Sequence, residues 1–339
     1  MFSYKINVTL PVNFKRSDCL HFRSEYSIFP LKILTLKKIT ATYDGICFKN
    51  SQLIRESVQA YPDKIRIFEL GAQLQFANQP FVSYSGEKPY LLIHHPWLNY
   101  YHWLTEAIPR IWLVRNHLSE LILLLPEYYK SVRFVQESLK PFNIKKTEYI
   151  PHGCNIKVSN AVVPQIKPVC SSYDPDVLSA IRSFYIEHAK TKRIKTPVSG
   201  ERIYIMRGNN PRRRILNEER LMKVLENHNF RSVRAESYSF PEQVLIAENT
   251  TYLISNGSGL TNMHFMRQGS SVMELQKRIT NMNDFHDKVL WHLSSALNLK
   301  YFYFICEPED KEQDMYTANL KINIKRFEKL IIRMLNFNS

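Results

Sequence analysis

The sequence contains few glycines and cysteines and has no long apolar run. Among its 339 residues are nine glycines and five cysteines. The cysteines are widely spaced, odd in number and include no CxxC pair, which argues against a disulfide framework or a zinc site and indicates reduced, buried thiols. The most apolar stretch, Leu121–Leu125, is too short to cross a bilayer, and residues 1–18 lack the apolar core of a signal peptide. These absences predict a cytoplasmic protein.

Charge of one sign is in clear excess. Lysine and arginine together number 46 and aspartate and glutamate 31, which gives a net charge of +15. Such an excess favours an anionic partner, and nucleic acid, anionic lipid and nucleotide phosphates all qualify. The lysines are spread along the chain. Only the arginines within residues 207–214 are concentrated enough to indicate a site.

The length suits two domains, because 339 residues exceed what one hydrophobic core usually organises. From Tyr90 onward, short buried strands alternate with helical patterns, which predicts an α/β fold with parallel sheets. We place an N-terminal α/β domain at residues 1–190 and a doubly wound nucleotide-binding domain at residues 200–318. A polar, basic stretch at residues 188–200 is the predicted linker.

The last segment, residues 319–339, is predicted to form an amphipathic helix. Phe327, Ile331 and Met334 share one helical face, and basic residues crowd the remainder. One interpretation is a helix on an anionic membrane surface. The other, which is the commoner case, is a final helix packed on the protein with a solvated basic face.

A cluster of arginines follows the strand predicted at residues 202–206. The segment 207–215 reads RGNNPRRRI, and loops at the carboxyl edge of a parallel sheet are where open α/β folds bind ligands. Guanidinium groups there suit bidentate contact with a diphosphate. A solvated basic loop is the alternative.

Two of the scarce glycines lie in one turn, between a predicted strand and a predicted helix. In the segment 255–262, SNGSGLTN, Gly257 and Gly259 let the backbone approach a ligand, and the free N–H groups of the following helix can bind phosphate. The segment is not the dinucleotide fingerprint GxGxxG, because its third glycine position is Asn262. Glu274, at the predicted end of the next strand, is either a ligand for ribose hydroxyls or an ordinary strand-end carboxylate.

A third group lies in the segment 94–110, which contains His102 and Glu106. These residues are four apart and share a helical face, so they can supply a general base with its orienting partner. A structural His–Glu pair is the alternative, and too few further ligands are apparent for a metal site. Pro109 is expected to begin a turn, cap or kink. Aromatic residues nearby, Tyr100, Tyr101 and Trp103, could face a sugar ring or pack in the core.

Together these segments resemble glycosyltransferase family 61. The segment 99–110, NYYHWLTEAIPR, resembles the family's N-terminal motif. Residues 204–207 with 212–215, and then 239–244, resemble the start of its donor domain, and residues 255–262 resemble its glycine motif. The similarity extends over residues 90–276, in order and at suitable spacing. One position departs from the family, which usually has histidine where this sequence has Asn256.

The resemblance implies a GT-B architecture, in which two Rossmann-like domains face each other across a cleft. It also implies a donor site in the C-terminal domain, an acceptor site in the N-terminal domain, a final helix that crosses back to the N-terminal domain, and inversion at the anomeric carbon. It implies no cofactor and no obligatory metal. The donor ligands that we predict from these residues are Arg207, Arg212, Arg213, Arg214, Asn256, Gly257, Ser258, Gly259, Leu260, Thr261 and Glu274.

The resulting hypothesis is transfer of a sugar from a nucleotide-diphosphate donor, preferably a UDP-sugar, to a carbohydrate acceptor that is free or lipid-linked. Glu106, oriented by His102, would deprotonate the acceptor hydroxyl. Bacterial surface or capsular polysaccharide synthesis is the preferred setting, in the cytoplasm or at the inner face of the membrane. The alternatives are an inactive sugar- or nucleotide-binding relative and a nucleic-acid-binding protein, although no nucleic-acid-binding module is recognisable. An oxidoreductase is disfavoured because GxGxxG with an acidic ribose ligand is missing.

Overall fold

The structure is a computed structural model that describes residues 3–16, 25–59, 65–196, 198, 200–208, 212–282, 284 and 288–337. Within these residues the chain forms two compact units. The described residues within Met1–Tyr4 and Ile28–Ser172 form unit 1. Those within Lys5–Ser27 and Tyr173–Ser339 form unit 2. The division therefore falls at Ser172 and not in the segment 188–200 that we predicted as a linker. Pro197 of that segment lies outside the described residues.

Unit 1 is built on an eight-stranded mixed sheet with the order β5-β4-β3-β10-β7-β8-β9, and β6 also pairs with β10. Strands β10, β7, β8 and β9 run parallel, and β3 is antiparallel to β10. Its strands are β3 (Ile33–Ala41), β4 (Cys47–Lys49), β5 (Gln52–Leu53), β6 (Phe81–Tyr84), β7 (Tyr90–Leu92), β8 (Ile122–Pro126), β9 (Lys146–Ile150) and β10 (Asn155–Pro164).

The helices of unit 1 are mostly short. They are α1 (Ile65–Asn78), α2 (Tyr100–His102), the π-helical turn η4 (Trp103–Ala107), α3 (Ile108–Leu113), α4 (Arg133–Leu139) and the 3₁₀ helices η2 (Arg55–Ser57), η5 (Arg115–Glu120) and η6 (Glu127–Ser131). Strands β7 and β8 are buried at every position, which explains why they read as unbroken apolar runs.

Unit 2 is built on a six-stranded sheet with the order β12-β11-β13-β14-β15-β16, parallel except for β16. Its strands are β11 (Arg202–Met206), β12 (Arg231–Arg234), β13 (Tyr252–Ser255), β14 (Ser271–Lys277), β15 (Lys300–Pro308) and β16 (Leu320–Lys321). A separate pair, β1 (Tyr4–Asn7) and β2 (Glu25–Ile28), forms a two-stranded sheet. Both units are thus layered α/β structures, which confirms the α/β part of the predicted fold class.

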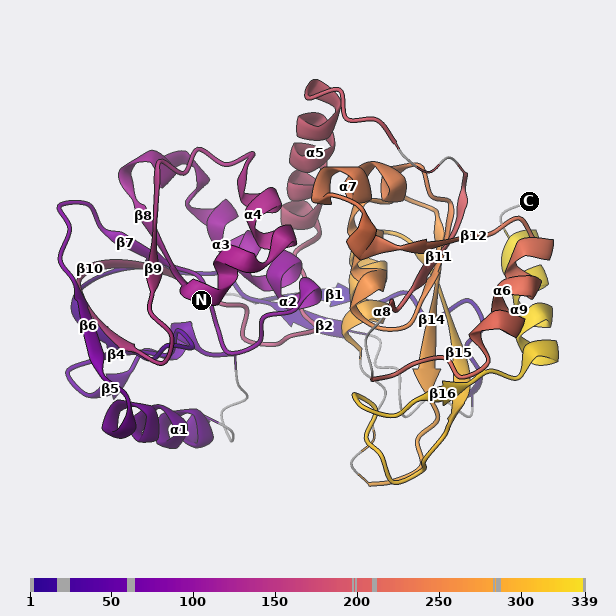
Figure 1. The fold of residues 1–339 in the computed structure, drawn as a ribbon, viewed down its shortest axis with the longest axis horizontal. Helices are drawn as coiled ribbons and strands as arrows, with labels where there is room; N and C mark the ends of the chain where they lie inside the picture. Colours follow the sequence, from indigo (N-terminus) through magenta and orange to yellow (C-terminus); the bar gives the residue numbers. More distant parts are fainter. Residues whose placement is uncertain are drawn as a thin grey trace. The chain divides into compact units, whose positions relative to one another are not determined.

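Helices cover both faces of the sheet in unit 2. They are α5 (Pro175–Thr191), α6 (Glu218–Asn227), α7 (Phe240–Glu248), α8 (Val289–Ala296), α9 (Ile324–Asn336) and the 3₁₀ helices η7 (Ala235–Ser237) and η8 (Ser258–Phe265). Figure 1 shows α6 and α9 on one face and α7 and α8 on the other. No helix in the described part of the chain is long and apolar enough to span a membrane.

The last helix, α9, packs within unit 2. Phe327, Ile331 and Met334 are fully buried in a cluster that includes Tyr204 of β11 and Phe304 of β15. We expected this helix to pack on the N-terminal domain, and its buried face lies instead on the sheet that immediately precedes it. This face of the sheet presents aromatic and aliphatic side chains that α6 alone does not cover, and α9 buries the rest of them.

Candidate active site

In unit 1, the strand order reverses between β7 and β10. The chain runs from β7 through β8 to β9 and then returns to place β10 on the other side of β7. Ligands of open α/β sheets bind at the carboxyl ends of the strands at such a switch point. Arg110 of α3 lies at this switch point. Its buried guanidinium donates from Nε to Pro164 O (2.6 Å), from Nη2 to Leu92 O (3.0 Å) and from Nη1 to His94 O (3.3 Å).

A single distorted helix, from α2 through η4 to α3, delivers the predicted pair. Asn99 caps it, because its side chain accepts a hydrogen bond from the backbone N–H of His102. Pro109 follows the π-helical turn Trp103–Ala107 and has no N–H to continue the ladder of backbone hydrogen bonds. The distortion that we predicted from Pro109 is thus a widened, π-helical turn, and Glu106 is one of the residues of this turn.

Glu106 is a fully buried carboxylate with both oxygens engaged. Its Oε2 accepts hydrogen bonds from His102 Nδ1 (2.7 Å) and His95 Nε2 (2.9 Å), and its Oε1 accepts one from the Cys170 thiol (3.3 Å). Burial alone would raise the pKa of Glu106. The hydrogen bonds from the two imidazoles, and the positive charge of Lys167, outweigh burial and hold that pKa well below 4.5.

The hydrogen bonds fix which nitrogen of each imidazole carries the proton. His95 Nδ1 accepts from the backbone N–H of Trp97 (3.4 Å), so its Nε2 is protonated and donates to Glu106. His102 Nδ1 must likewise be protonated to donate to the same oxygen. The lone pair of His102 is therefore on Nε2, which has no hydrogen-bond partner in the described part of the protein. The side chain of His102 is 16% exposed and that of Glu106 is 0% exposed.

The same three side chains form a potential metal cluster. One ligand atom from each of His95, His102 and Glu106 lies within 4.8 Å of the others. The nitrogens that face Glu106 carry protons in this arrangement, however, and a metal would have to replace both. For His95, moving the proton to Nδ1 would set it against the N–H of Trp97. The geometry thus fits a hydrogen-bonded base with its orienting groups better than a metal centre.

The exposed aromatic residue at this site is Trp97, which was not predicted from the sequence. Tyr101 and Trp103 are buried, and Trp103 Nε1 donates to Ser138 Oγ, so these two rings are core residues. Trp97 is 45% exposed, and its ring centroid lies 5.6 Å from that of His102. No motif marked Trp97, since only the fold brings the segment after β7 against the helix.

Unit 2 has its own switch point, between β11 and β13. The chain passes from β11 to β12 on one side and then crosses to β13 on the other. Arg207 directly follows β11, and Asn256 with Gly257 directly follows β13. Two segments that are separated by almost fifty residues of sequence are therefore adjacent at the edge of the sheet where ligands bind. Both segments were predicted from the sequence to bind the donor.

Asn256 organises two of the predicted arginines. Its Oδ1 accepts from Arg213 Nη2 (2.9 Å), its Nδ2 donates to Arg213 O (2.9 Å), and its backbone oxygen accepts from Arg207 Nη1 (3.3 Å). Arg207 Nε also donates to Arg212 O (2.7 Å). Burial, and the charge of Arg213, lower the pKa of Arg207 to about 10. Within the described residues Arg207 forms no ion pair, so this cation lacks a compensating carboxylate.

Gly257 lets both guanidinium groups approach the turn. Its φ is +90°, and a Cβ at this position would lie 2.6 Å from Arg207 Nη1 and 3.3 Å from Arg213 Nη1. Any other residue would be strained and would displace a guanidinium group. Ser258 and Gly259 are partly exposed at the start of η8, whereas the Leu260 and Thr261 side chains are buried, so Leu260 and Thr261 can offer a ligand only backbone groups.

Three predicted donor residues do not join this cluster through their side chains. The Arg212 and Arg214 side chains are exposed, and backbone groups of Arg214 bond to Asn319 and Leu320. Glu274 is not at a strand end, because β14 continues to Lys277. Its buried Oε2 accepts hydrogen bonds from Tyr301 (2.5 Å) and Gln276 (3.1 Å), which makes it a core residue.

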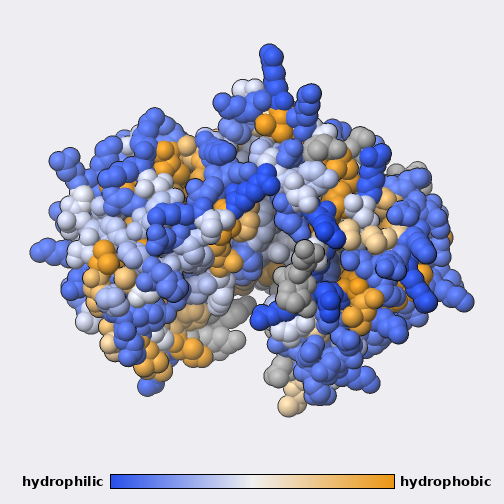
Figure 2. All heavy atoms as spheres, in the orientation of Figure 1, coloured by the Kyte–Doolittle hydropathy of each residue, from blue (hydrophilic) through white to orange (hydrophobic). Residues whose placement is uncertain are grey.

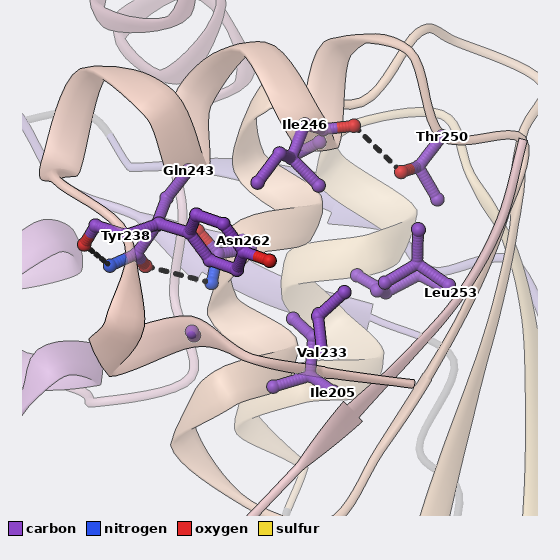
Figure 3. Close-up of a pocket in the computed structure, with 11 residues that line it drawn as sticks. Ile205, Val233, Tyr238, Gln243, Ile246, Thr250, Leu253 and Asn262 are labelled. Carbon is purple, nitrogen blue, oxygen red and sulfur yellow. Dashed lines mark hydrogen bonds between the residues drawn. The ribbon is translucent and has the colours of Figure 1, made fainter. Parts of the chain in front are cut away.

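A small apolar pocket adjoins the turn, between α7 and the sheet (Figure 3). Figure 3 shows the amides of Gln243 and Asn262 meeting at one end of it, with Asn262 Nδ2 3.5 Å from Gln243 Oε1. Asn262 Nδ2 also donates to Gly259 O (3.2 Å), which connects the pocket to the glycine turn. The pocket is lined by Ile203, Ile205, Val233, Ala235, Tyr238, Gln243, Ile246, Ala247, Thr250, Leu253 and Asn262.

Unit 2 is thus a doubly wound domain with two arginines at its switch point, and unit 1 carries a buried cluster of His95, His102 and Glu106 near its own. The chain belongs to glycosyltransferase family 61, since the family described as Glycosyltransferase 61 matches residues 100–273, more than half of the 339 residues. The resemblance seen in the sequence is confirmed. No curated protein matches the chain.

Proposed function

We propose that this glycosyltransferase is an inverting, metal-independent enzyme of GT-B architecture that uses a nucleotide-diphosphate sugar, preferably a UDP-sugar. The observation that carries the proposal is the convergence of Arg207 and Arg213 on the Gly257 turn at the switch point of unit 2. Two adjacent cations, one of which has no carboxylate partner in the described residues, suit a diphosphate.

The donor half of the proposal uses fixed positive charge. As the bond between the anomeric carbon and the diphosphate oxygen breaks, negative charge grows on the leaving diphosphate. Arg207, Arg213 and the backbone N–H groups at the start of η8 would stabilise that charge. Glu236 is the candidate for the ribose hydroxyls in place of Glu274, since a Cβ on Gly208 would fall 1.8 Å from its Oε1.

The acceptor half assigns the base to His102 and not to Glu106. His102 Nε2 would take the proton of the acceptor hydroxyl while that oxygen attacks the anomeric carbon opposite the diphosphate. The new carbon–oxygen bond forms as the old one breaks, and the proton ends on the imidazole. Glu106 remains ionised, orients the ring and stabilises its positive charge. The burial of Glu106 and the hydrogen bonds to both its oxygens support assigning the base to His102 and the orienting role to Glu106.

The acceptor is a carbohydrate, either free or lipid-linked. Synthesis of a bacterial surface or capsular polysaccharide, in the cytoplasm or at the inner face of the membrane, is the setting that we propose. The rival is an inactive relative that only binds a sugar nucleotide, which Asn256 in place of the family's usual histidine would favour. The hydrogen bonds of Asn256 to Arg213 favour the active alternative, because the amide holds this guanidinium group next to the glycine turn.

The test is thermal unfolding with UDP, GDP, CMP and NAD, each with and without magnesium. A ligand of the native state raises the unfolding midpoint in proportion to the logarithm of its concentration over Kd. We expect a shift with UDP that does not need magnesium and is lost in Arg207→Ala but kept in Arg214→Ala. A shift with NAD alone, or with no nucleotide, would overturn the proposal. UDP release from a UDP-sugar then separates an active enzyme from an inactive relative.

A further inference from the structure

Arg213 has an unusual backbone conformation for an arginine. Its φ is +59°, in the left-handed region that residues with a Cβ adopt only at a cost in free energy. Such a conformation persists where neighbouring groups hold it in place, and it occurs preferentially at functional sites. The same residue has one of the two guanidinium groups that lie beside Gly257. The contacts that hold the backbone of Arg213 therefore bear on the proposed donor site.

These contacts come from two sides of the arginine segment, residues 212–214. On the side of the glycine turn, Arg207 Nε donates to Arg212 O (2.7 Å), and Asn256 Nδ2 donates to Arg213 O (2.9 Å). The contacts on the other side come from β16 and from the connection between β15 and β16, which lies after the strand pair Glu307–Lys321 and Pro308–Leu320.

This connection, residues 309–319, is called the 309–319 hairpin below. Arg213 N–H donates to Thr317 O (3.3 Å), and Arg214 N–H donates to the side-chain oxygen Oδ1 of Asn319 (3.0 Å). Directly after the hairpin, the backbone N–H of the first residue of β16 donates to Arg214 O (2.8 Å). The hairpin and β16 thus bind consecutive backbone groups of the arginine segment.

Much of the hairpin is polar and exposed. Residues 309–314 are all polar and exposed, and in Figure 2 the lowest part of unit 2, where Figure 1 draws the loops below β16, is mainly hydrophilic. The position of the hairpin therefore depends largely on hydrogen bonds. Asn319 makes three of them, because its Nδ2 donates to Glu309 Oε2 (2.9 Å), its backbone oxygen accepts from Glu309 N–H (2.8 Å) and its Oδ1 accepts from Arg214. Asn319 thus joins the two ends of the hairpin to the arginine segment.

The hairpin is also supported by the loop that follows β14. Thr280 Oγ1 (2.6 Å) and Asn281 Nδ2 (2.8 Å) both donate to Lys311 O. That loop is in turn anchored by a buried ion pair between Lys277, the last residue of β14, and Asp284. A continuous series of contacts therefore leads from the end of β14 through the hairpin to the arginine segment.

We propose that the 309–319 hairpin is part of the donor site, where it holds Arg213 in position for the diphosphate, and that Asn319 is the positioning residue. This inference rests on the proposed function, because it requires that Arg213 binds the donor anion. Asn319 acts through the backbone of Arg214, which it holds next to the left-handed residue. Without this contact, Arg213 populates commoner backbone conformations, and its guanidinium group lies beside Gly257 for a smaller fraction of the time.

The experiment is isothermal titration calorimetry of the full chain with inorganic pyrophosphate, at fixed ionic strength. Asn319→Ala should weaken binding by about threefold to tenfold, the effect of one lost hydrogen bond. Asn249→Ala is the matched control, since it removes a side-chain contact to a backbone oxygen (Leu245 O, 3.0 Å) at the end of α7 and should leave the affinity unchanged. Thermal unfolding of each variant shows that it is folded at the temperature of the titration.

A double-mutant cycle distinguishes positioning from a general loss of structure. Arg213→Gly removes the guanidinium group without strain, because glycine adopts a φ of +59° readily. If Asn319 acts through Arg213, Asn319→Ala should cause no further loss of affinity in the Arg213→Gly background. Equal losses in both backgrounds, or wild-type affinity in Asn319→Ala, would overturn this inference alone. No binding of pyrophosphate by the wild type would overturn the proposed function, and the inference with it.

Discussion

Asn256 holds Arg213 at two points, accepting from the guanidinium at Oδ1 and donating from Nδ2 to the backbone oxygen of the same residue, each at 2.9 Å. An amide can do both at any pH at which the protein is folded, because it provides an acceptor and a donor on one planar group. A substitution that changes only the side-chain amide of Asn256 therefore tests whether Arg213 binds an anion.

Asn256→Asp should weaken the binding of inorganic pyrophosphate by about tenfold to a hundredfold, or about 1.4 to 2.7 kcal/mol. The new carboxylate has the size of the amide but pairs with Arg213 and competes with the bound anion. Isothermal titration calorimetry at fixed ionic strength gives the affinity. Asn229→Asp adds the same charge elsewhere in unit 2 and should change little. Equal affinities for wild type and Asn256→Asp would remove Arg213 from the donor site.

Gly257→Ala should abolish the UDP-induced shift and destabilise the protein by more than about 1 kcal/mol, because φ is +90° and the methyl group would displace Arg207. Gly269→Ala is the matched control. Its φ is +80°, but a Cβ there meets nothing within 4 Å, so it carries the backbone strain without the contact. Denaturant unfolding and the nucleotide shift are measured on both. If Gly269→Ala loses the UDP shift as well, the effect belongs to backbone strain and not to the arginines.

His102→Ala should lower the rate of UDP release from the best UDP-sugar donor by about 10² to 10⁴, the usual contribution of a general base. Glu106→Gln should lower it less, because the imidazole keeps a hydrogen-bond partner but loses the negative charge that stabilises it once it has taken the acceptor proton. Cys170→Ser keeps a donor to Glu106 Oε1 and should leave the rate unchanged. A wild-type rate in Glu106→Gln would reduce Glu106 to a structural role.

Stability should fall on acidification from pH 6.5 to 4. Burial lowers the pKa of His94 to about 3 and that of His264 to about 4, from an ordinary 6.5. In that window the unfolded chain binds protons at both positions and the folded chain does not, so the free energy of unfolding falls by up to about 1.4 kcal/mol per pH unit for each. His264→Gln should reduce the slope of stability against pH in denaturant titrations. A slope unchanged by His264→Gln would show that this histidine is protonated in the folded protein.

Much of the proposed donor site could be predicted from local sequence. Arg207 and Gly257 each follow an apolar strand, and the carboxyl ends of parallel strands share one edge of the sheet, so their proximity follows from the pattern. The sequence could not show which of the neighbouring arginines turn inward. Arg213 does and Arg214 does not, because Asn256 binds the first and β16 binds the backbone of the second.

The proposed acceptor side was harder to predict from the sequence. The spacing of His102 and Glu106 predicted that they meet, but their roles depend on burial, which a motif does not report. His95 and Cys170 reach Glu106 from segments after two different strands, β7 and β10, and no spacing relates them. The final helix was misplaced for a similar reason, because its apolar face fits any uncovered sheet and only the fold decides which one.

The carbonyl groups that Arg110 binds are those of Pro164, Leu92 and His94, at the ends of two neighbouring strands. One buried side chain thus ties the ends of β7 and β10 together, since all three acceptors are satisfied by a single guanidinium group. The loops that follow these strands do not have to hold the strand ends in place, so we expect them to tolerate substitution better than Arg110 does.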